Sequence, residues 1–154
     1  MKLILFLCLL LPTISFAQIS KETCKSYNVE FEDINSQLPM QVDYTTQLIG
    51  LNTMYTNKIC YMHYEYLVSE KVFLENMVKA LAKNNIETSA QELIEFYKTS
   101  NGHKKLQDDF KRMQLKRLHG NTAMETFLKY KGVITVTSVF SGDIPNLTLN
   151  IKED

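Results

Sequence analysis

The sequence predicts an α+β fold, in which one antiparallel sheet of about four strands carries roughly three to four helices on one face. Segments rich in β-branched and aromatic residues lie toward both ends of the chain, and helical spacing dominates the part between them. No repeat, linker or low-complexity tract divides the chain, so we expect one domain over residues 18–154. Two hairpins in one sheet would leave the face opposite the helices partly open.

The first seventeen residues have the composition of a secretory signal peptide. Lys2 supplies a positive charge, residues 3–11 are an almost unbroken apolar run, and Ser15 and Ala17 occupy the small-residue positions of a cleavage site. The run is too short to span a bilayer, and no later run is longer. We therefore expect cleavage between Ala17 and Gln18 and a mature protein in the periplasm or outside the cell.

The segment before the first hairpin is predicted to be irregular and then helical. Residues 18–28 are mostly polar and show no clear periodicity. A short amphipathic helix is predicted from apolar residues at helical spacing, which are Phe31, Ile34 and Leu38. Pro39 is expected to end this helix, because the residue before a proline is biased away from helical backbone angles.

A hairpin is predicted next. Residues 45–54 and 58–68 read as its two strands, and the second has the strongest β-branched and aromatic enrichment in the chain. Residues 55–57 supply the turn. In the second strand, Tyr61 and His63 are expected to face one way, and Tyr64 and Tyr66 share the other face with Cys60 and Met62.

The part between the hairpins is predicted to be helical. Ser69 is placed to begin a helix that runs to about Lys83. Ser89 and Glu92 form a capping box that opens a second, shorter helix.

Two further helices are predicted before the last strands. A break at residues 101–102 precedes a helix over about residues 103–119. Thr122 and Glu125 form a second capping box, and Gly132 is expected to supply the left-handed residue that ends the last helix. Residues 133–140 and 146–152 then read as the closing hairpin, with three apolar residues of the last strand facing the core: Leu147, Leu149 and Ile151.

Two cysteines remain once the leader is removed, because Cys8 lies within the apolar run. In an exported protein, Cys24 and Cys60 are expected to form a disulfide. The bond would tie the front of the mature chain to the second strand and stabilise the fold by about 3–4 kcal/mol. No C-x-x-C spacing is present, so we favour a structural role over a catalytic thiol.

The composition excludes a general nucleic-acid binder and offers no metal or catalytic motif. The chain has 17 Lys+Arg and 17 Asp+Glu, so it lacks the basic surplus that phosphate contacts need. Cys60 and His63 have metal-ligand spacing, but residues three apart in a strand point to opposite faces. With no G-x-S-x-G or phosphate-binding loop, we expect no metal, no cofactor and no motif-defined active site.

Two surfaces are candidates for binding. One of the two side-chain sets of the strand over residues 58–68 must face the helices, and the other would line the open face, where exposed aromatic residues can stack on sugars or anchor a partner. The sequence does not decide which face is covered, and Tyr61 and His63 are the candidate binding residues. Lys105, Arg112 and Lys116 would form a basic ridge on the helix over residues 103–119, able to meet anionic headgroups or an acidic protein. The alternative for the strand residues is that they are ordinary strand formers that fill a core. The alternative for the basic ridge is that it is a solvated helix face.

One part of the sequence resembles a known group of proteins. An N-x-x-L-P-x-x-V-D-x-x-T-x-L pattern, followed by Tyr64-x-Tyr66, is formed by Asn35, Leu38, Pro39, Val42, Asp43, Thr46 and Leu48. It resembles small exported, uncharacterised bacterial proteins, in which such a segment leads into a hairpin and a later glycine precedes the last strands. The resemblance implies an α+β periplasmic domain and no particular activity.

Three functions remain open at this point. The first is a non-enzymatic interaction module that binds a protein or envelope component. The second is a small hydrolase whose site is assembled only in three dimensions. The third is a carrier that holds a small hydrophobic ligand between the sheet and the helices.

Overall fold

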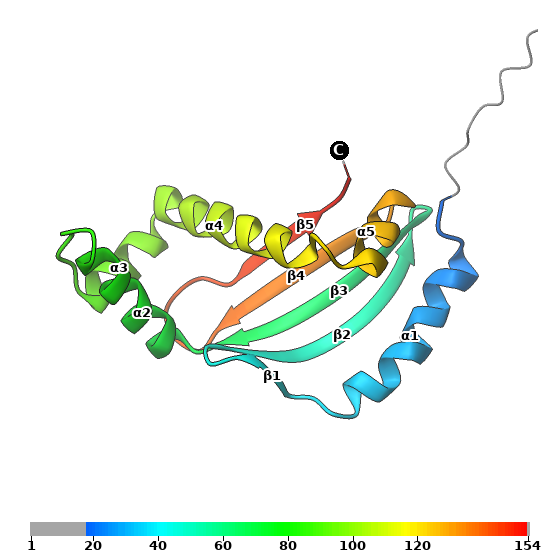
Figure 1. Ribbon diagram of the computed structural model, residues 1–154, viewed down its shortest axis with the longest axis horizontal. Coiled ribbons are helices and arrows are strands. Elements are labelled where there is room, and N and C mark those ends of the chain that lie inside the picture. Colours follow the sequence, from blue (N-terminus) through cyan, green and yellow to red (C-terminus); the bar gives the residue numbers. More distant parts are fainter. Residues whose placement is uncertain (1–17, 154) are drawn as a thin grey trace, which may run out of the picture.

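The computed structural model describes residues 18–153, in which helices cover one face of a curved sheet (Figure 1). The predicted leader lies outside the described residues. The helices are α1 (Lys21–Asn35), α2 (Glu70–Ala82), α3 (Ala90–Lys98), α4 (Ser100–Leu118) and α5 (Thr122–Lys129). The strands are β1 (Met40–Asp43), β2 (Thr46–Thr56), β3 (Ile59–Val68), β4 (Val133–Phe140) and β5 (Leu147–Ile151). The α+β class is therefore confirmed, with five helices and five strands in the described part.

The sheet is mixed, which corrects the antiparallel prediction. Its strands follow chain order from β1 to β5. Both predicted hairpins are antiparallel, but β3 and β4 run parallel where the two hairpins meet. The chain between these strands includes α2 to α5, which together form the long crossover that a parallel pair requires.

Strand register divides the sheet into a helical face and an uncovered face. Met62 lies opposite Ile134, and Ile134 lies opposite Ile151, so these three apolar side chains share the helical face. All three are at most 4% exposed. Tyr61 and His63 alternate with Met62 and so occupy the uncovered face.

Helix α1 begins where the sequence predicted irregular chain. Ser20 caps it, because the Ser20 hydroxyl accepts a hydrogen bond from the amide of Thr23 at 3.1 Å. Only Cys24 and Phe31 of this helix are buried. The predicted helix through Phe31 and Ile34 is therefore the C-terminal part of α1, which ends at Asn35, before Leu38 and Pro39. Its first turns were missed in the sequence, because two buried residues seven positions apart leave little apolar periodicity to detect.

Asparagine side chains attach α1 to the part of β2 that β1 does not reach. The Asn28 amide group accepts from the backbone N–H of Thr53 at 2.6 Å and donates to the Thr53 carbonyl at 3.2 Å. Asn35 makes the same pair of hydrogen bonds to Leu51, at 3.2 and 2.8 Å. These amides thus take the place of a neighbouring strand and satisfy an exposed sheet edge.

We expect Asn28→Ala to lower the free energy of unfolding by about 1–2 kcal/mol, because the backbone N–H and C=O of Thr53 would lose their partners. Urea unfolding measures this change. Asn52→Ala is the matched control, since Asn52 is exposed on the uncovered face and should change stability by less than about 0.5 kcal/mol. Equal stability of the two variants would contradict this role for Asn28.

The first capping box is confirmed, but the second is not formed, because α5 is capped by a single asparagine side chain one residue before Thr122. The Ser89 hydroxyl accepts from the amide of Glu92 at 3.2 Å, and the Glu92 carboxylate accepts from the Ser89 amide at 2.7 Å. At α5 the cap is Asn121, whose side-chain oxygen accepts from the amide of Met124 at 3.2 Å. Asparagine is an equally good cap, so Thr122 becomes the first helical residue.

Two glycines have roles other than those predicted. Gly102 does not break a helix but lies in the first turn of α4, where a Cβ atom would come 1.9 Å from the carbonyl oxygen of Phe96. Gly132 does not supply the left-handed residue, because Lys131 has the positive φ, at 59°. A Cβ on Gly132 would lie 2.3 Å from the ring of Phe127. Both positions therefore need glycine for close packing.

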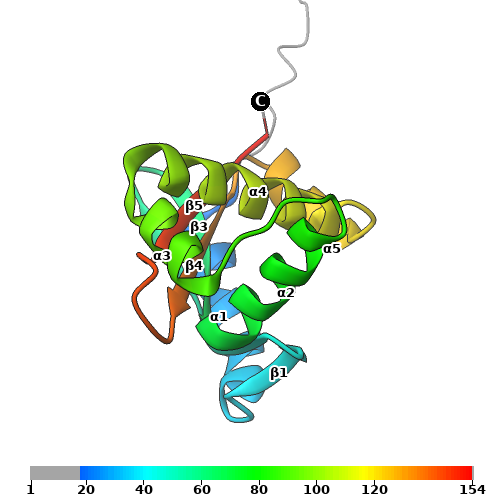
Figure 2. The same ribbon diagram turned by 90° about the vertical axis from the view of Figure 1, so that its left-hand side faces the viewer.

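The two cysteines lie at disulfide distance, with their sulfur atoms 1.98 Å apart. Cys24 comes from α1 and Cys60 from β3, and each is only 1% exposed. The Thr53 hydroxyl donates to the Cys24 carbonyl at 2.6 Å, which adds a contact between α1 and β2 at the same place. Helix α1 thus lies along the β2 edge of the sheet, and in Figure 2 it appears with β1 below α4.

Candidate functional site

An apolar patch lies at one end of the uncovered face. Tyr61 in β3 lies between Met54 in β2 and Val133 in β4, according to the strand register. Ile59 lies two residues before Tyr61 and therefore faces the same way. Met54 is 58% exposed, although it is apolar. This patch brings aromatic and aliphatic side chains together where β3 and β4 begin.

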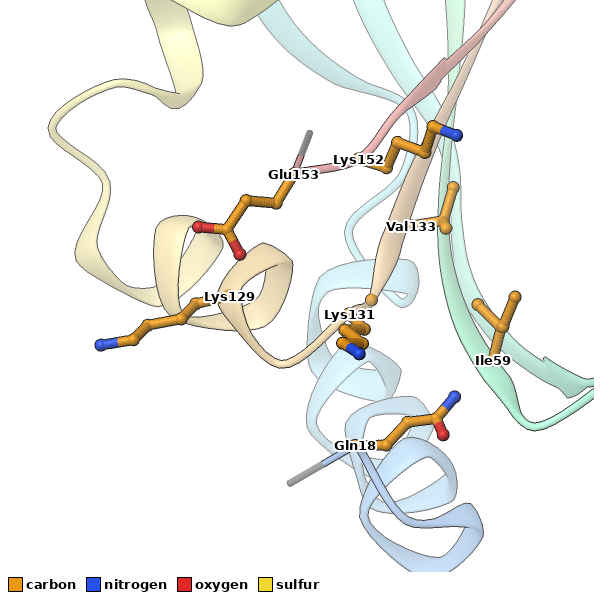
Figure 3. Close-up of a pocket in the computed structure, with 8 residues that line it drawn as sticks. Gln18, Ile59, Lys129, Lys131, Val133, Lys152 and Glu153 are labelled. Carbon is orange, nitrogen blue, oxygen red and sulfur yellow. The ribbon is translucent and has the colours of Figure 1, made fainter. Parts of the chain in front are cut away.

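A hollow of about 590 Å³ adjoins this patch. Ile59 and Val133, the first residues of β3 and β4, supply its apolar surface. The remaining lining residues come from the ends of three other segments: Gln18, Lys129, Lys131, Gly132, Lys152 and Glu153. In Figure 3, Gln18 and Lys131 lie across from Ile59 and Val133, and the side chains of Lys129 and Lys152 extend away from each other. We call this feature the lysine-rimmed hollow.

Backbone hydrogen bonds fix the segments that form the hollow. The amide of Ile19 donates to the carbonyl of Tyr130 at 3.3 Å, which joins the start of the described chain to the end of α5. The amide of Gly132 donates to the carbonyl of Phe127 at 3.0 Å. The side-chain amide of Gln18 donates to the carbonyl of Lys58, in the turn before β3. The hollow is therefore built on anchored backbone.

The rim carries more positive than negative charge. The lining residues include three lysines, Lys129, Lys131 and Lys152, and one carboxylate, that of Glu153. In the part of the chain that the structure describes, no salt bridge within 4.0 Å uses any of these three lysines. Their ammonium groups are free to meet an anion, and their methylene stems extend the apolar surface.

The predicted residues Tyr61 and His63 have different surroundings. Tyr61 belongs to the apolar patch beside the hollow. His63 lies further along the uncovered face, where its Nε2 atom is 2.9 Å from the hydroxyl of Thr137. Cys60 faces the helices instead, so the structure separates it from His63. Within residues 18–153, no group of three or more His, Cys, Asp or Glu residues is arranged to hold a metal ion.

The other tyrosines of β3 are part of the helical face. The rings of Tyr64 and Tyr66 are stacked with their centroids 6.2 Å apart. The Tyr64 hydroxyl lies 3.1 Å from the sulfur of Met62 and 3.4 Å from that of Met124. Burial raises the pKa of Tyr64 well above its ordinary value. These two tyrosines pack against the helices, as expected if aromatic residues of this strand fill the core.

The predicted basic ridge is partly neutralised. Lys105 and Arg112 both form ion pairs with Asp109, the first at 2.9 Å. Burial would raise the pKa of Asp109, but hydrogen bonds and positive charge from these two residues outweigh it and lower the pKa. Lys116 is exposed on the same helix. Because α4 covers the helical face, the structure does not bring this ridge together with Tyr61 and His63 (Figure 1).

Asp43 has the turn role that its position predicts. Its Oδ1 atom accepts from the amide of Thr45 at 2.9 Å and from the Thr45 hydroxyl at 2.6 Å. Its Oδ2 atom pairs with Arg117 of α4 at 2.8 Å. Burial would raise the pKa of Asp43, but these hydrogen bonds and those of Thr46 and Arg117 lower it overall. The carboxylate therefore joins the β1–β2 turn to α4.

Sequence reasoning missed the lysines of the hollow. Lys129 ends α5, Lys131 lies in the following turn, and Lys152 follows β5. No spacing rule links these positions, because α5 and β5 are brought together only by the sheet. The available signal was that each lysine lies at or just beyond the end of a helix or strand.

Comparisons with known proteins find a shared fold. No protein-family model matches the chain, and no curated protein matches it. A crystal structure of a "putative secreted protein" from Pseudomonas aeruginosa aligns with a TM-score of 0.50 at 12% identity, over 88% of this chain and 95% of that chain. At this identity the likeness concerns the fold alone. The chain therefore has an α+β fold that is also found in that bacterial protein, and the N-x-x-L-P motif stays a prediction.

Proposed function

We propose that the mature chain is an exported, non-enzymatic binding module that holds an anionic amphiphile, with the acyl chain on the apolar patch and the headgroup on the lysines. The observation that carries this proposal is the lysine-rimmed hollow beside Tyr61. Its volume of about 590 Å³ falls within the range of small-molecule sites, roughly 300–1,000 Å³. An apolar surface bordered by cations complements a ligand with one apolar and one anionic part.

Export is supported by the leader and by the cysteine pair. The first seventeen residues have signal-peptide composition, and disulfides persist in oxidising compartments. Within residues 18–153, no helix is both long enough and apolar enough to cross a membrane. The bacterial envelope that such a protein enters is rich in anionic amphiphiles, which is consistent with the proposed ligand class.

The positions of the carboxyl groups with lowered pKa values favour binding over hydrolysis. Asp43 and Asp109 have lowered pKa values because of hydrogen bonds within a turn and a helix. Neither of them lines the lysine-rimmed hollow. A hydrolytic site needs a base or acid directed at the bound ligand, whereas the charged groups of this hollow are mainly cations suited to hold an anion.

The test compares two triple variants that remove the same charge. Lys129→Gln/Lys131→Gln/Lys152→Gln is expected to weaken binding of lysophosphatidylglycerol about tenfold or more, since each lysine near an anionic group contributes about 1 kcal/mol. Lys104→Gln/Lys111→Gln/Lys116→Gln, on the exposed side of α4, is the control and should bind like the wild type. Calorimetric titration below the micelle concentration measures both.

Two outcomes would contradict the proposal. The first is equal affinity of both triple variants and the wild type. The second is a loss of binding in the α4 variant alone, which would assign binding to the exposed lysines of α4. Zwitterionic lysophosphatidylcholine serves as the ligand control, and its binding should be weaker and less sensitive to salt.

A further inference from the structure

Gln18 has an unusual place for the residue expected to begin the mature chain. It lines the lysine-rimmed hollow, together with Lys131 and Ile59. Its side-chain amide is bound to the carbonyl of Lys58, and the next residue, Ile19, is bound to Tyr130. Ile19 is 7% exposed, so its side chain is inserted into the core. The chain is therefore anchored immediately after the predicted cleavage position.

We propose that cleavage between Ala17 and Gln18 completes the binding site, because it places the new α-ammonium group of Gln18 at the rim of the hollow as a ligand-binding cation. This inference rests on the proposed function. Before cleavage, the same nitrogen is an uncharged peptide amide. After cleavage, it adds a fourth cation to the three lysines that line the hollow. Removal of the leader then switches on part of the ligand affinity.

The pKa of an α-amino group allows its contribution to ligand affinity to be distinguished from that of the lysines. Its ordinary pKa is about 7.7–8.0, whereas an ordinary lysine side chain titrates near 10.4. Among residues 18–153, the charged residues that line the hollow or bind Gln18 are four lysines and one glutamate, namely Lys58, Lys129, Lys131, Lys152 and Glu153. Between pH 7 and pH 9, the α-ammonium group loses its proton while ordinary lysines keep theirs. Affinity that depends on Gln18 should therefore fall over this range.

The experiment compares the chain that begins at Gln18 with a free amino group and the same chain with an acetylated amino group. At pH 7, acetylation is expected to weaken lysophosphatidylglycerol binding about fivefold, because one nearby cation is lost. At pH 9 the two forms should bind equally. The phosphodiester of this ligand keeps one negative charge throughout, so the ligand does not add its own titration. Thermal unfolding of the two forms should agree.

A second variant removes a chemical side reaction. An N-terminal glutamine can cyclise through its own side-chain amide, with loss of ammonia, and would then lack the amino group. Gln18→Ser cannot cyclise, and its free and acetylated forms should show the same fivefold difference at pH 7. Mass spectrometry of each sample verifies the state of the amino group.

The results distinguish the two proposals. If acetylation leaves affinity unchanged at pH 7 in both pairs, the role of the α-ammonium group is wrong. If the Lys129/Lys131/Lys152 variant still loses binding in that case, the proposed function stands. If neither change affects affinity, both proposals are overturned. This inference would also be overturned if mass spectrometry showed that the exported protein begins at a residue other than Gln18.

Discussion

Replacement of both Cys24 and Cys60 by alanine is expected to lower the free energy of unfolding by about 3–4 kcal/mol. The bond closes a loop between residues 36 positions apart, so its loss frees much of the unfolded chain. It also removes the main covalent restraint on α1, which buries only two of its residues. For a domain of this size, the melting temperature should fall by roughly 10 °C.

Urea unfolding of the oxidised wild type and the double alanine variant measures this effect. The control is dithiothreitol, which should destabilise the wild type and leave the alanine variant unchanged. Hydrogen exchange in the variant should show early loss of protection in α1, with the strands still protected. Equal unfolding midpoints for the two proteins, or two free thiols in exported native protein, would contradict this account.

Replacement of Ile134 by alanine is expected to cost about 3–4 kcal/mol, since removing a large aliphatic side chain from a closed core leaves a cavity. Ile134 is fully buried, at 0% exposure, on the helical face of β4. The next residue back, Val133, is only half-buried on the uncovered face. Val133→Ala is therefore the matched control, with an expected cost below about 1 kcal/mol.

The pair of variants also separates stability from binding. Val133 lines the lysine-rimmed hollow, so Val133→Ala should weaken amphiphile binding although the fold remains stable. Denaturant unfolding and the lysophosphatidylglycerol titration give the two readouts. Similar costs for Ile134→Ala and Val133→Ala would show that both faces of β4 are covered, which is incompatible with an open binding face.

Local signals in the sequence predicted much of the secondary structure. Residues 133–140 form the strand that their β-branched composition indicates, and Ser89 with Glu92 forms the predicted capping box. These predictions succeed because strand formation and capping depend on neighbouring residues. The same local reasoning placed Tyr61 and His63 on one face of β3.

The parts that failed depend on distant contacts. The parallel pairing of β3 with β4 follows from how four intervening helices return the chain, which no local pattern records. Helix α1 depends on the disulfide and on Asn28 and Asn35, whose partners lie in β2. The candidate site also depends on distant contacts. Tyr61 was found from the sequence, but the lysines come from segments that meet only in the folded chain.

The asparagine contacts of α1 have a consequence for the behaviour of concentrated protein. An unsatisfied strand margin is a template on which a second molecule can add its own backbone. Here, Asn28 and Asn35 occupy one long margin, and on the other side the Gln107 amide donates to the carbonyl of Thr148 at 3.4 Å. Carboxamide groups therefore occupy backbone positions of β2 and β5 to which a strand of another molecule could otherwise bind.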